Sequence, residues 1–217
     1  MNLYQRWIVP RLVELAMGQP QMQDYRRKLV PEAHGRVLEI GVGSGMNLPL
    51  YAGGVREVVG VDPSEELLEM ARQRTAEAGR PVTLTRADAA SLPLDDASFD
   101  AIVMTWTLCS IADPAAALGE MRRVLKPGGA LLFIEHGLSP DPGVARWQHR
   151  LTPVWRRFTG GCHLDRKMDD LFRAAGFALP ELRNEYAKGP RQMTYMYEGR
   201  AVRPGDGSQS VVSSRTK

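Results

Sequence analysis

The sequence predicts one α/β domain with a doubly wound, mostly parallel sheet of seven strands, on the strength of three observations. First, residues 36–47 (RVLEIGVGSGMN) form a short apolar strand that runs straight into three glycines at every second position. This is the generic nucleotide-binding element of such folds. Second, strand and helix patterns alternate four times between residues 36 and 136, as parallel strands with crossover helices require. Third, Asp62 and Asp88 follow the second and third strands, where α/β sheets bind ligands.

Each expected element has a local signal. The strands are short apolar runs, and Ser64 stands where a helix N-cap would, with Glu66 in an acidic first turn. Residues 126–129 (KPGG) stop a helix and turn the chain. The predicted strands are 36–41, 57–61, 82–86, 99–104, 130–134, 177–183 and 193–199, and the predicted helices are 64–78, 114–125 and 167–175.

Three segments stand apart from this alternation. Residues 1–30 carry apolar side chains at helical spacing, and Pro10 should kink or split them into a pair of helices that cover the sheet or the cofactor cleft. In the main domain, 31–202, the segment 138–166 interrupts the alternation, and we interpret it as an inserted lid. Residues 203–217 are rich in Ser, Gly and charge, and we expect a disordered tail.

Composition narrows the function. The chain of 217 residues can bury one sizeable core, and its net charge of +3 is too small to indicate a nucleic-acid partner. The two cysteines, Cys109 and Cys162, lie far apart without a Cys-x-x-Cys motif. That pattern fits a reducing compartment and predicts no structural zinc site built on cysteines, so we expect no metal. With no transmembrane run and no secretory signal, we expect a cytoplasmic protein.

The polar residues around the glycines suit an adenosine with an amino-acid tail. Asp62 lies where a carboxylate accepts hydrogen bonds from ribose hydroxyls, and Asp88 is placed to accept from an adenine amine. Glu39, inside a strand, needs a partner, which a cofactor ammonium would supply directly or through backbone amides. The competing cofactor, a nicotinamide dinucleotide, usually requires Gly-x-Gly-x-x-Gly, whereas this chain has Gly-x-Gly-x-Gly. The helix expected to begin near Asn47 adds free N–H donors. The candidate cofactor-binding residues are Glu39, Gly41, Gly43, Gly45, Asn47, Asp62, Pro63, Asp88, Ala89 and Thr105.

These motifs together resemble the class I S-adenosylmethionine-dependent methyltransferases. The matching segments, in order and spacing, are 38–45 (LEIGVGSG), 61–62 (VD), 87–89 (ADA), 99–100 (FD) and 125–129 (LKPGG). The resemblance implies a Rossmann-like methyltransferase fold and S-adenosyl-L-methionine as the cofactor. A closer resemblance, at 107–110 (TLCS), 135–136 (EH) and from Trp147 through 161–166 (GCHLDR), is to a methyltransferase-like family whose animal members are membrane-anchored alkyl thiol S-methyltransferases. It implies a small apolar thiol as the acceptor. The chain departs from that family at the front, where it has only a mild amphipathic segment.

The acceptor chamber is predicted at the ends of the fourth and fifth strands and under the lid. A thiol needs little base assistance because its pKa of about 8.5 leaves some thiolate at neutral pH, whereas an amine needs a route for its proton. His136 is the first candidate to take a proton and His163 the second. The residues expected to line the chamber are Trp106, Thr107, Cys109 and Trp147.

Three alternatives stay open at this point. The stripe of aromatics and arginines at 146–158 is read as a buried face or an apolar lid rather than a nucleic-acid surface. The fourth strand also ends without the Asn/Asp-Pro-Pro-aromatic run of many enzymes that methylate planar amines. The acceptor could instead be a phospholipid head group or a quinone, reached through a weak peripheral membrane contact at Trp7 and Ile8. A third reading is a module that binds the cofactor without catalysis.

Overall fold

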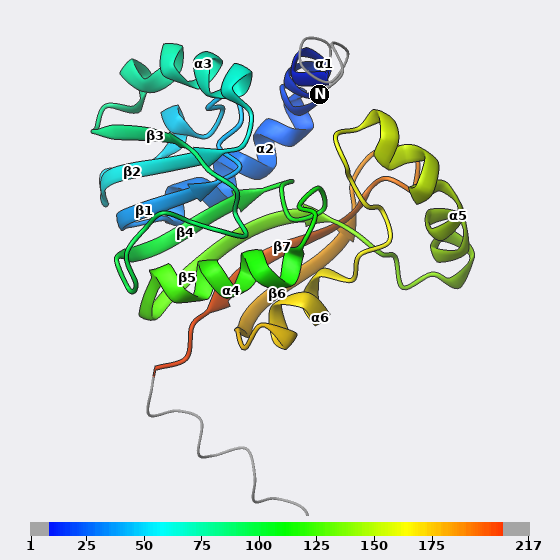
Figure 1. Ribbon diagram of the computed structural model, residues 1–217. Helices are drawn as coiled ribbons and strands as arrows, with labels where there is room; N and C mark the ends of the chain where they lie inside the picture. Colours follow the sequence, from blue (N-terminus) through cyan, green and yellow to red (C-terminus); the bar gives the residue numbers. More distant parts are fainter. Residues whose placement is uncertain (1–8, 206–217) are drawn as a thin grey trace, which may run out of the picture.

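The computed structural model describes residues 9–205 and contains the predicted seven-stranded sheet (Figure 1). The strand order is β3-β2-β1-β4-β5-β7-β6. The strands β1 to β5 pair in parallel, and β7 runs antiparallel to both β5 and β6. The strand bounds are β1 Gly35–Ile40, β2 Val55–Asp62, β3 Val82–Arg86, β4 Phe99–Thr105, β5 Leu125–His136, β6 Ala178–Tyr186 and β7 Tyr195–Val202.

Helices cover both faces of the sheet, as the doubly wound topology predicts. The helix bounds are α1 Val9–Met17, α2 Pro20–Leu29, α3 Glu65–Arg74, α4 Pro114–Val124, α5 Pro142–Phe158 and α6 Met168–Ala174. Side chains alternate along β1, so that Leu38 and Ile40 join α4 and α6 in one core, while Val37 joins α2 and α3 in the other. The predicted N-cap is confirmed, because the Ser64 hydroxyl accepts from the Leu67 N–H.

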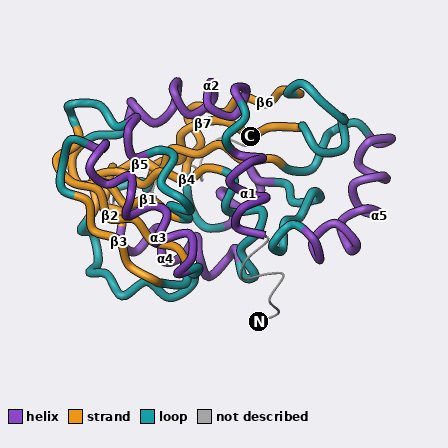
Figure 2. Tube along the Cα trace, turned by 90° about the horizontal axis from the view of Figure 1, so that it is seen from above, coloured by secondary structure: helices purple, strands orange, loops and turns teal. Residues whose placement is uncertain are grey.

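The inserted segment forms α5, which stands out from the body of the sheet in two views at right angles (Figures 1 and 2). Buried Gln148 anchors it. Its amide donates to the carbonyls of Gly137 and Gln192 and accepts from the Ser139 N–H, at 2.9, 3.1 and 2.9 Å. One face of α5 is therefore fixed to the end of β5, and the opposite face meets solvent.

Three expectations need correction. The helix expected to begin near Asn47 is only a single 3-10 turn, Leu48–Leu50, because the chain folds back at once to bury Leu48 and Tyr51. Pro10 lies within α1, and the break that separates α1 from α2 falls at residues 18–19 instead. The expected disordered tail does not begin at Arg203, whose guanidinium donates to the Leu125 carbonyl at 2.6 Å.

Some expectations concern residues outside the described range. The proposed membrane contact at Trp7 and Ile8 and the tail beyond residue 205 fall there. Across residues 9–205, none of the helices has both the length and the apolar character needed to cross a membrane.

Candidate active site

The glycine turn after β1 is held against the neighbouring strand ends. The Gly41 N–H donates to the Val61 carbonyl at 2.9 Å, and the Gly45 N–H closes the turn onto the Val42 carbonyl at 2.9 Å. Gly41 has a φ of +68°, and a β-carbon there would collide with the Thr107 side chain. Glycine is thus required at this position both by conformation and by space. The contact also places the turn after β4 directly beside the glycine turn.

Asp62, at the end of β2, faces the glycine turn. Its two carboxylate oxygens accept from the Gly43 N–H at 3.0 Å and from the Ser64 N–H at 2.9 Å. The side chain is buried, and burial raises its pKa, against the effect of these two hydrogen bonds. A carboxylate has about four acceptor positions, so Asp62 keeps capacity for the two hydroxyls of a ribose.

Glu39 projects from β1 into a buried polar cluster on the same side of the sheet as α2. Its carboxylate accepts from the Tyr51 hydroxyl at 2.7 Å and from the Asn47 side-chain amide at 2.9 Å. The Asn47 amide also donates to the Thr105 hydroxyl at 3.2 Å. Two side chains, those of Tyr51 and Asn47, therefore hold the carboxylate. Within the described part of the chain, the side-chain amide oxygen of Asn47 (Oδ1) is buried without a hydrogen-bond partner.

That unpaired acceptor is a test of cofactor fit. A buried acceptor without a partner is costly, and an ammonium group brings three N–H donors. The Glu39 carboxylate supplies the opposite charge beside it, and the neighbouring Arg26 also acts on that carboxylate through its charge. The cluster thus fits the amino-acid end of S-adenosylmethionine, with Glu39 and Asn47 as its partners.

The protonation of Glu39 gives this site a pH dependence. Burial raises the pKa of Glu39 to about 7, against the hydrogen bonds from Tyr51 and Asn47 and the charge of Arg26. Because this pKa lies above the usual value of 4.5, the protonated acid stabilises the cofactor-free fold. That contribution to the free energy of unfolding is lost as the pH rises toward and through 7. A bound ammonium favours the ionised form. We expect affinity for S-adenosylhomocysteine, by calorimetry, to rise about tenfold from pH 6 to pH 8; a flat profile would contradict the assignment. Burial also raises the pKa of Asp62, which faces the same site, so Glu39→Gln serves as the control. The affinity of this variant should rise much less between pH 6 and pH 8.

Replacing Asp62 tests the ribose contacts. Asp62→Ala removes an ionised acceptor, and hydrogen bonds to charged groups contribute about 1.5–3 kcal/mol. We expect S-adenosylhomocysteine to bind roughly 10- to 150-fold more weakly. Asp62→Asn keeps one side-chain oxygen that can accept from a backbone N–H. Comparison of the two variants therefore distinguishes loss of the ribose contacts from loss of the hydrogen bonds that support the glycine turn. Near-wild-type binding by both variants would remove Asp62 from the site.

The N-terminal helices pack over this end of the sheet. The Arg74 guanidinium joins α1 to the glycine turn, since it donates to Glu14 at 2.7 Å and to the Ser44 carbonyl at 2.6 Å. From α2, the Arg26 guanidinium lies 4.8 Å from the centre of the Trp106 ring and donates to the Met17 carbonyl at 2.7 Å. Trp106 has a φ of +51°, a strained conformation for a bulky residue. The strain and the packing fix its ring beneath α2.

Glu135 organises the turn that follows β4. Its fully buried carboxylate accepts from three successive backbone N–H groups, those of Thr107, Leu108 and Cys109, at 2.7, 2.8 and 3.3 Å. Burial raises its pKa to about 7, against these hydrogen bonds. The carboxylate therefore determines where Thr107 and Cys109 lie, and it acts as a positioning residue for the acceptor side of the site.

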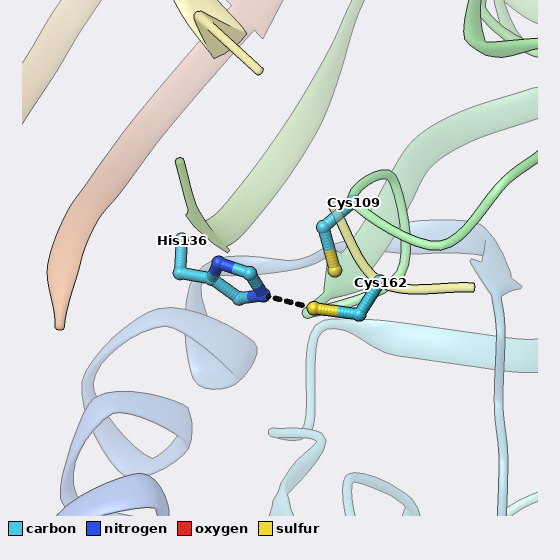
Figure 3. A group of neighbouring side chains, drawn as sticks. All are labelled: Cys109, His136 and Cys162. Atoms are coloured by element: carbon cyan, nitrogen blue, oxygen red, sulfur yellow. Dashed lines mark hydrogen bonds between the residues drawn. The ribbon is translucent and has the colours of Figure 1, made fainter. Parts of the chain in front are cut away.

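One of the two predicted proton acceptors, His136, comes together with both cysteines. Nε2 of His136 lies 3.0 Å from Sγ of Cys162, and Cys109 completes the group (Figure 3). The backbone N–H of His163 donates to the Cys109 carbonyl at 2.8 Å, which holds the segment after α5 against the turn after β4. His163 itself is half-buried, with Nδ1 3.6 Å from the Asp165 carboxylate, and burial lowers its pKa.

Other predicted residues lie elsewhere. Trp147 is 59% exposed on the outer face of α5, so the structure does not bring it to the chamber; Trp155 packs there instead and donates to Cys162 Sγ at 3.3 Å. Asp88 is exposed and accepts from the Ala90 N–H at 2.9 Å, while Ala89 is buried in the core beside it. Pro63 is exposed, and its carbonyl accepts from Arg86 at 3.1 Å.

Four residues that contact the candidate site were not predicted from the sequence as site residues: Arg26, Tyr51, Glu135 and Trp155. Glu135 carries a signal that could have identified it, because it is an acid at the end of an apolar strand, as Glu39 is within one. Tyr51 and Arg26 carry none, since only the fold brings them to Glu39.

The family model described as a methyltransferase domain matches residues 38–133. The chain is 39% identical over 120 residues to a demethylmenaquinone methyltransferase of Clavibacter sepedonicus (55% of this chain, 49% of that protein). It is 37% identical over 161 residues to the human thiol S-methyltransferase TMT1B (68% and 65%). It is also 36% identical over 137 residues to a phosphatidylethanolamine N-methyltransferase of Cereibacter sphaeroides (61% and 66%). The chain spans about half to two thirds of the length of these relatives.

Solved structures share the fold. Several described as methyltransferases superpose with TM-scores of 0.60 to 0.68 at 18–27% identity, covering 78–92% of this chain and 57–99% of theirs. Fold and matching domain together define a class I methyltransferase domain whose cofactor is S-adenosylmethionine. Residues 38–133 thus match the methyltransferase-domain family, and the predicted fold, class of domain and cofactor are confirmed. Within that class, its sequence is similar to the thiol S-methyltransferases TMT1B, as well as to the quinone and phospholipid enzymes.

Proposed function

We propose that the chain transfers a methyl group from S-adenosylmethionine to the sulfur of a small apolar thiol. When bound, the cofactor supplies an electrophilic methyl group on a sulfonium. Glu39 and Asn47 hold its ammonium, Asp62 its ribose and Asp88 its adenine, with Ala89 and Pro63 beside them. The glycine turn and Thr105 shape the crevice. The acceptor lies on the far side of Thr107, among Trp106, Cys109 and Trp155.

The observation that carries the choice of a thiol is the engagement of His136. Its Nε2 faces Cys162 at 3.0 Å, so it is not a free base for an acceptor arriving with a firmly held proton. A thiol needs little such help, because part of it is already thiolate near neutral pH. His163 remains the candidate for the last proton transfer, since its lowered pKa keeps the ring neutral and able to accept. The similarity to TMT1B supports the same acceptor class.

A panel of acceptors tests this proposal. The protein is incubated with methyl-labelled cofactor and matched alkyl thiols, phenols and amines, and labelled products are identified by mass spectrometry. We expect thioethers from the thiols and little product from the amines. Transfer to an amine or a phenol with none to any thiol would refute the thiol assignment. Cofactor binding without transfer to any of the compounds would favour a binding module.

A second candidate, methylation of a lipid head group or a quinone at a bilayer, is favoured by the outer face of α5. Trp147, Val154 and Phe158 are 59%, 53% and 60% exposed and recur at helical spacing. The exposed arginines 146, 150 and 157 follow one edge of this stripe. An exposed apolar stripe beside cations suits the surface of an anionic bilayer. The similarity to the quinone and phospholipid enzymes points the same way.

Vesicle sedimentation separates the two candidates. Vesicles of anionic and of neutral phospholipid are mixed with wild-type protein, with Trp147→Ala/Phe158→Ala, and with Leu15→Ala, a matched change at an exposed apolar residue of α1. Removal of residues 1–20 tests the contact expected at Trp7. Sedimentation with anionic vesicles that depends on α5, together with label transfer to vesicle lipid or quinone, would establish this candidate. No sedimentation by the wild-type chain would dismiss it.

A further inference from the structure

We propose that Cys109, His136 and Cys162 form a binding site for a thiophilic divalent cation, with Zn²⁺ as the cation of choice. Their ligand atoms, two sulfurs and one imidazole nitrogen, lie within 4.8 Å of one another, and both cysteines are buried (Figure 3). Zinc bonds of about 2.3 Å to sulfur and 2.0–2.1 Å to nitrogen place tetrahedral ligands roughly 3.4–3.8 Å apart. His136 Nε2 and Cys162 Sγ, now 3.0 Å apart, would separate by about 0.5 Å, and no pair would have to approach by more than about 1 Å.

The three ligands come from distant parts of the chain, which is why their spacing predicts no such site. Cys109 follows β4, His136 ends β5 and Cys162 follows α5. Sequence spacing identifies zinc sites whose ligands come in close pairs, whereas this group is assembled by neighbouring strand ends and by the segment that returns from α5. The proposal thus revises the expectation that the chain holds no metal.

Surrounding contacts hold the two cysteines in place. Glu135 fixes the turn of Cys109 through three backbone N–H groups. The Arg166 guanidinium donates to the Leu108 carbonyl at 2.5 Å and so ties the segment after Cys162 to the same turn. The Trp155 indole N–H donates to Cys162 Sγ at 3.3 Å, a hydrogen bond that stabilises a thiolate. Contacts of this kind around the ligands orient and tune metal sites.

Charge favours a cation in this position. Two buried thiolates alone would be strongly disfavoured, but together with a divalent cation and a neutral imidazole they form a group of zero net charge. Soft sulfur ligands select Zn²⁺ or Cu⁺ over Mg²⁺ and Ca²⁺. Three protein ligands, as in catalytic zinc sites, leave the fourth tetrahedral position open.

The role of that open position rests on the proposed function. The acceptor sulfur would bind there as a thiolate, having given up its proton, for which His163 is the candidate acceptor. It would then form a bond to the methyl carbon as the carbon–sulfonium bond breaks, which yields a thioether and S-adenosylhomocysteine; the zinc stays divalent throughout. Thr107, two residues before Cys109, contacts the glycine turn, so the site lies beside the cofactor crevice.

Metal titration of the reduced 217-residue chain tests the site. The protein is purified without a histidine tag, stripped with a chelator, and titrated with Zn²⁺ and with Co²⁺. We expect one equivalent per chain and the thiolate charge-transfer and d–d bands of tetrahedral cobalt. Binding should be lost in Cys109→Ser and Cys162→Ser and weakened in His136→Gln. His149→Gln, at the exposed histidine of α5 that pairs with Asp165, should bind as wild type does.

Several results would overturn the site, and others only its role. The site is overturned if the reduced wild type does not bind the metal stoichiometrically, or if binding survives both cysteine variants. It is also overturned if both free thiols are lost in air with the mass change of a disulfide, even when metal has been added beforehand. Retained S-adenosylhomocysteine binding by the variants excludes misfolding. An alkyl thiol should shift the cobalt bands. If it leaves them unchanged, or if thiol methylation survives complete metal removal, the role falls while the proposed function stands.

Discussion

Glu39→Gln should weaken binding of S-adenosylhomocysteine by roughly two to four orders of magnitude, the largest effect expected of a single change in the cofactor crevice. Glu39 is 1% exposed, and its carboxylate is the buried negative charge placed to receive the cofactor ammonium. Removing one partner of a buried charge pair costs about 3–5 kcal/mol. Isothermal titration calorimetry at pH 8, where the carboxylate is ionised, measures the loss.

The control for this experiment is Glu57→Gln. Glu57 lies on the adjacent strand and pairs with Arg36 at the surface, with 42% of its side chain exposed, and its neutralisation should leave cofactor affinity unchanged. Stability gives an independent readout. Because burial raises the pKa of Glu39 to about 7, the ionised carboxylate disfavours the cofactor-free fold above that pH. The amide should therefore not lower the unfolding midpoint at pH 8. Loss of affinity together with a large loss of stability would indicate a structural role instead.

Gly41→Ala should destabilise the cofactor-free protein by about 2–5 kcal/mol. The left-handed conformation, with φ of +68°, costs an alanine roughly 1–2 kcal/mol, and the new methyl group would overlap the Thr107 side chain, with an overpacking cost of about 1–3 kcal/mol. Relief of that overlap displaces the turn between β4 and Cys109. We therefore expect methyl transfer to fall along with stability.

Gly79→Ala separates the two contributions. Gly79 has a φ of +63°, close to that of Gly41, but a β-carbon there meets nothing within 4 Å. Its replacement should cost only the conformational part, about 1–2 kcal/mol. Urea unfolding of both variants and the wild type gives the comparison. Equal destabilisation of the two would mean that Thr107 does not press on the glycine turn.

The sheet was predictable because its signals are local. Apolar runs of strand length, the glycines after β1 and the cap at Ser64 each act within a few residues, and their positions agree with the structure to within a few residues for most elements. The 3-10 turn after Asn47 was missed because burial of Tyr51 against Glu39, a contact between separate segments, overrides the local preference for a helix.

The acceptor side was less predictable for the same reason. Helical spacing correctly marked residues 147–158 as amphipathic, but it cannot say which face meets the core. Gln148 anchors α5 so that Trp155 turns inward and Trp147 outward. Likewise, Cys109 and Cys162 are far apart in the sequence, so their proximity to each other and to His136 could not be predicted from it. Residues whose role depends on which strand ends are neighbours become visible only in the fold.

A crystal structure of the protein with S-adenosylhomocysteine and an alkyl thiol tests the central claim most directly. The account predicts the ammonium on Glu39 and the side-chain oxygen of Asn47, and the ribose hydroxyls on Asp62. It also predicts that the two sulfur atoms face each other beside Cys109, His136 and Cys162. A ligand whose amino-acid end lies away from Glu39, or whose sulfur points away from that group, would contradict it.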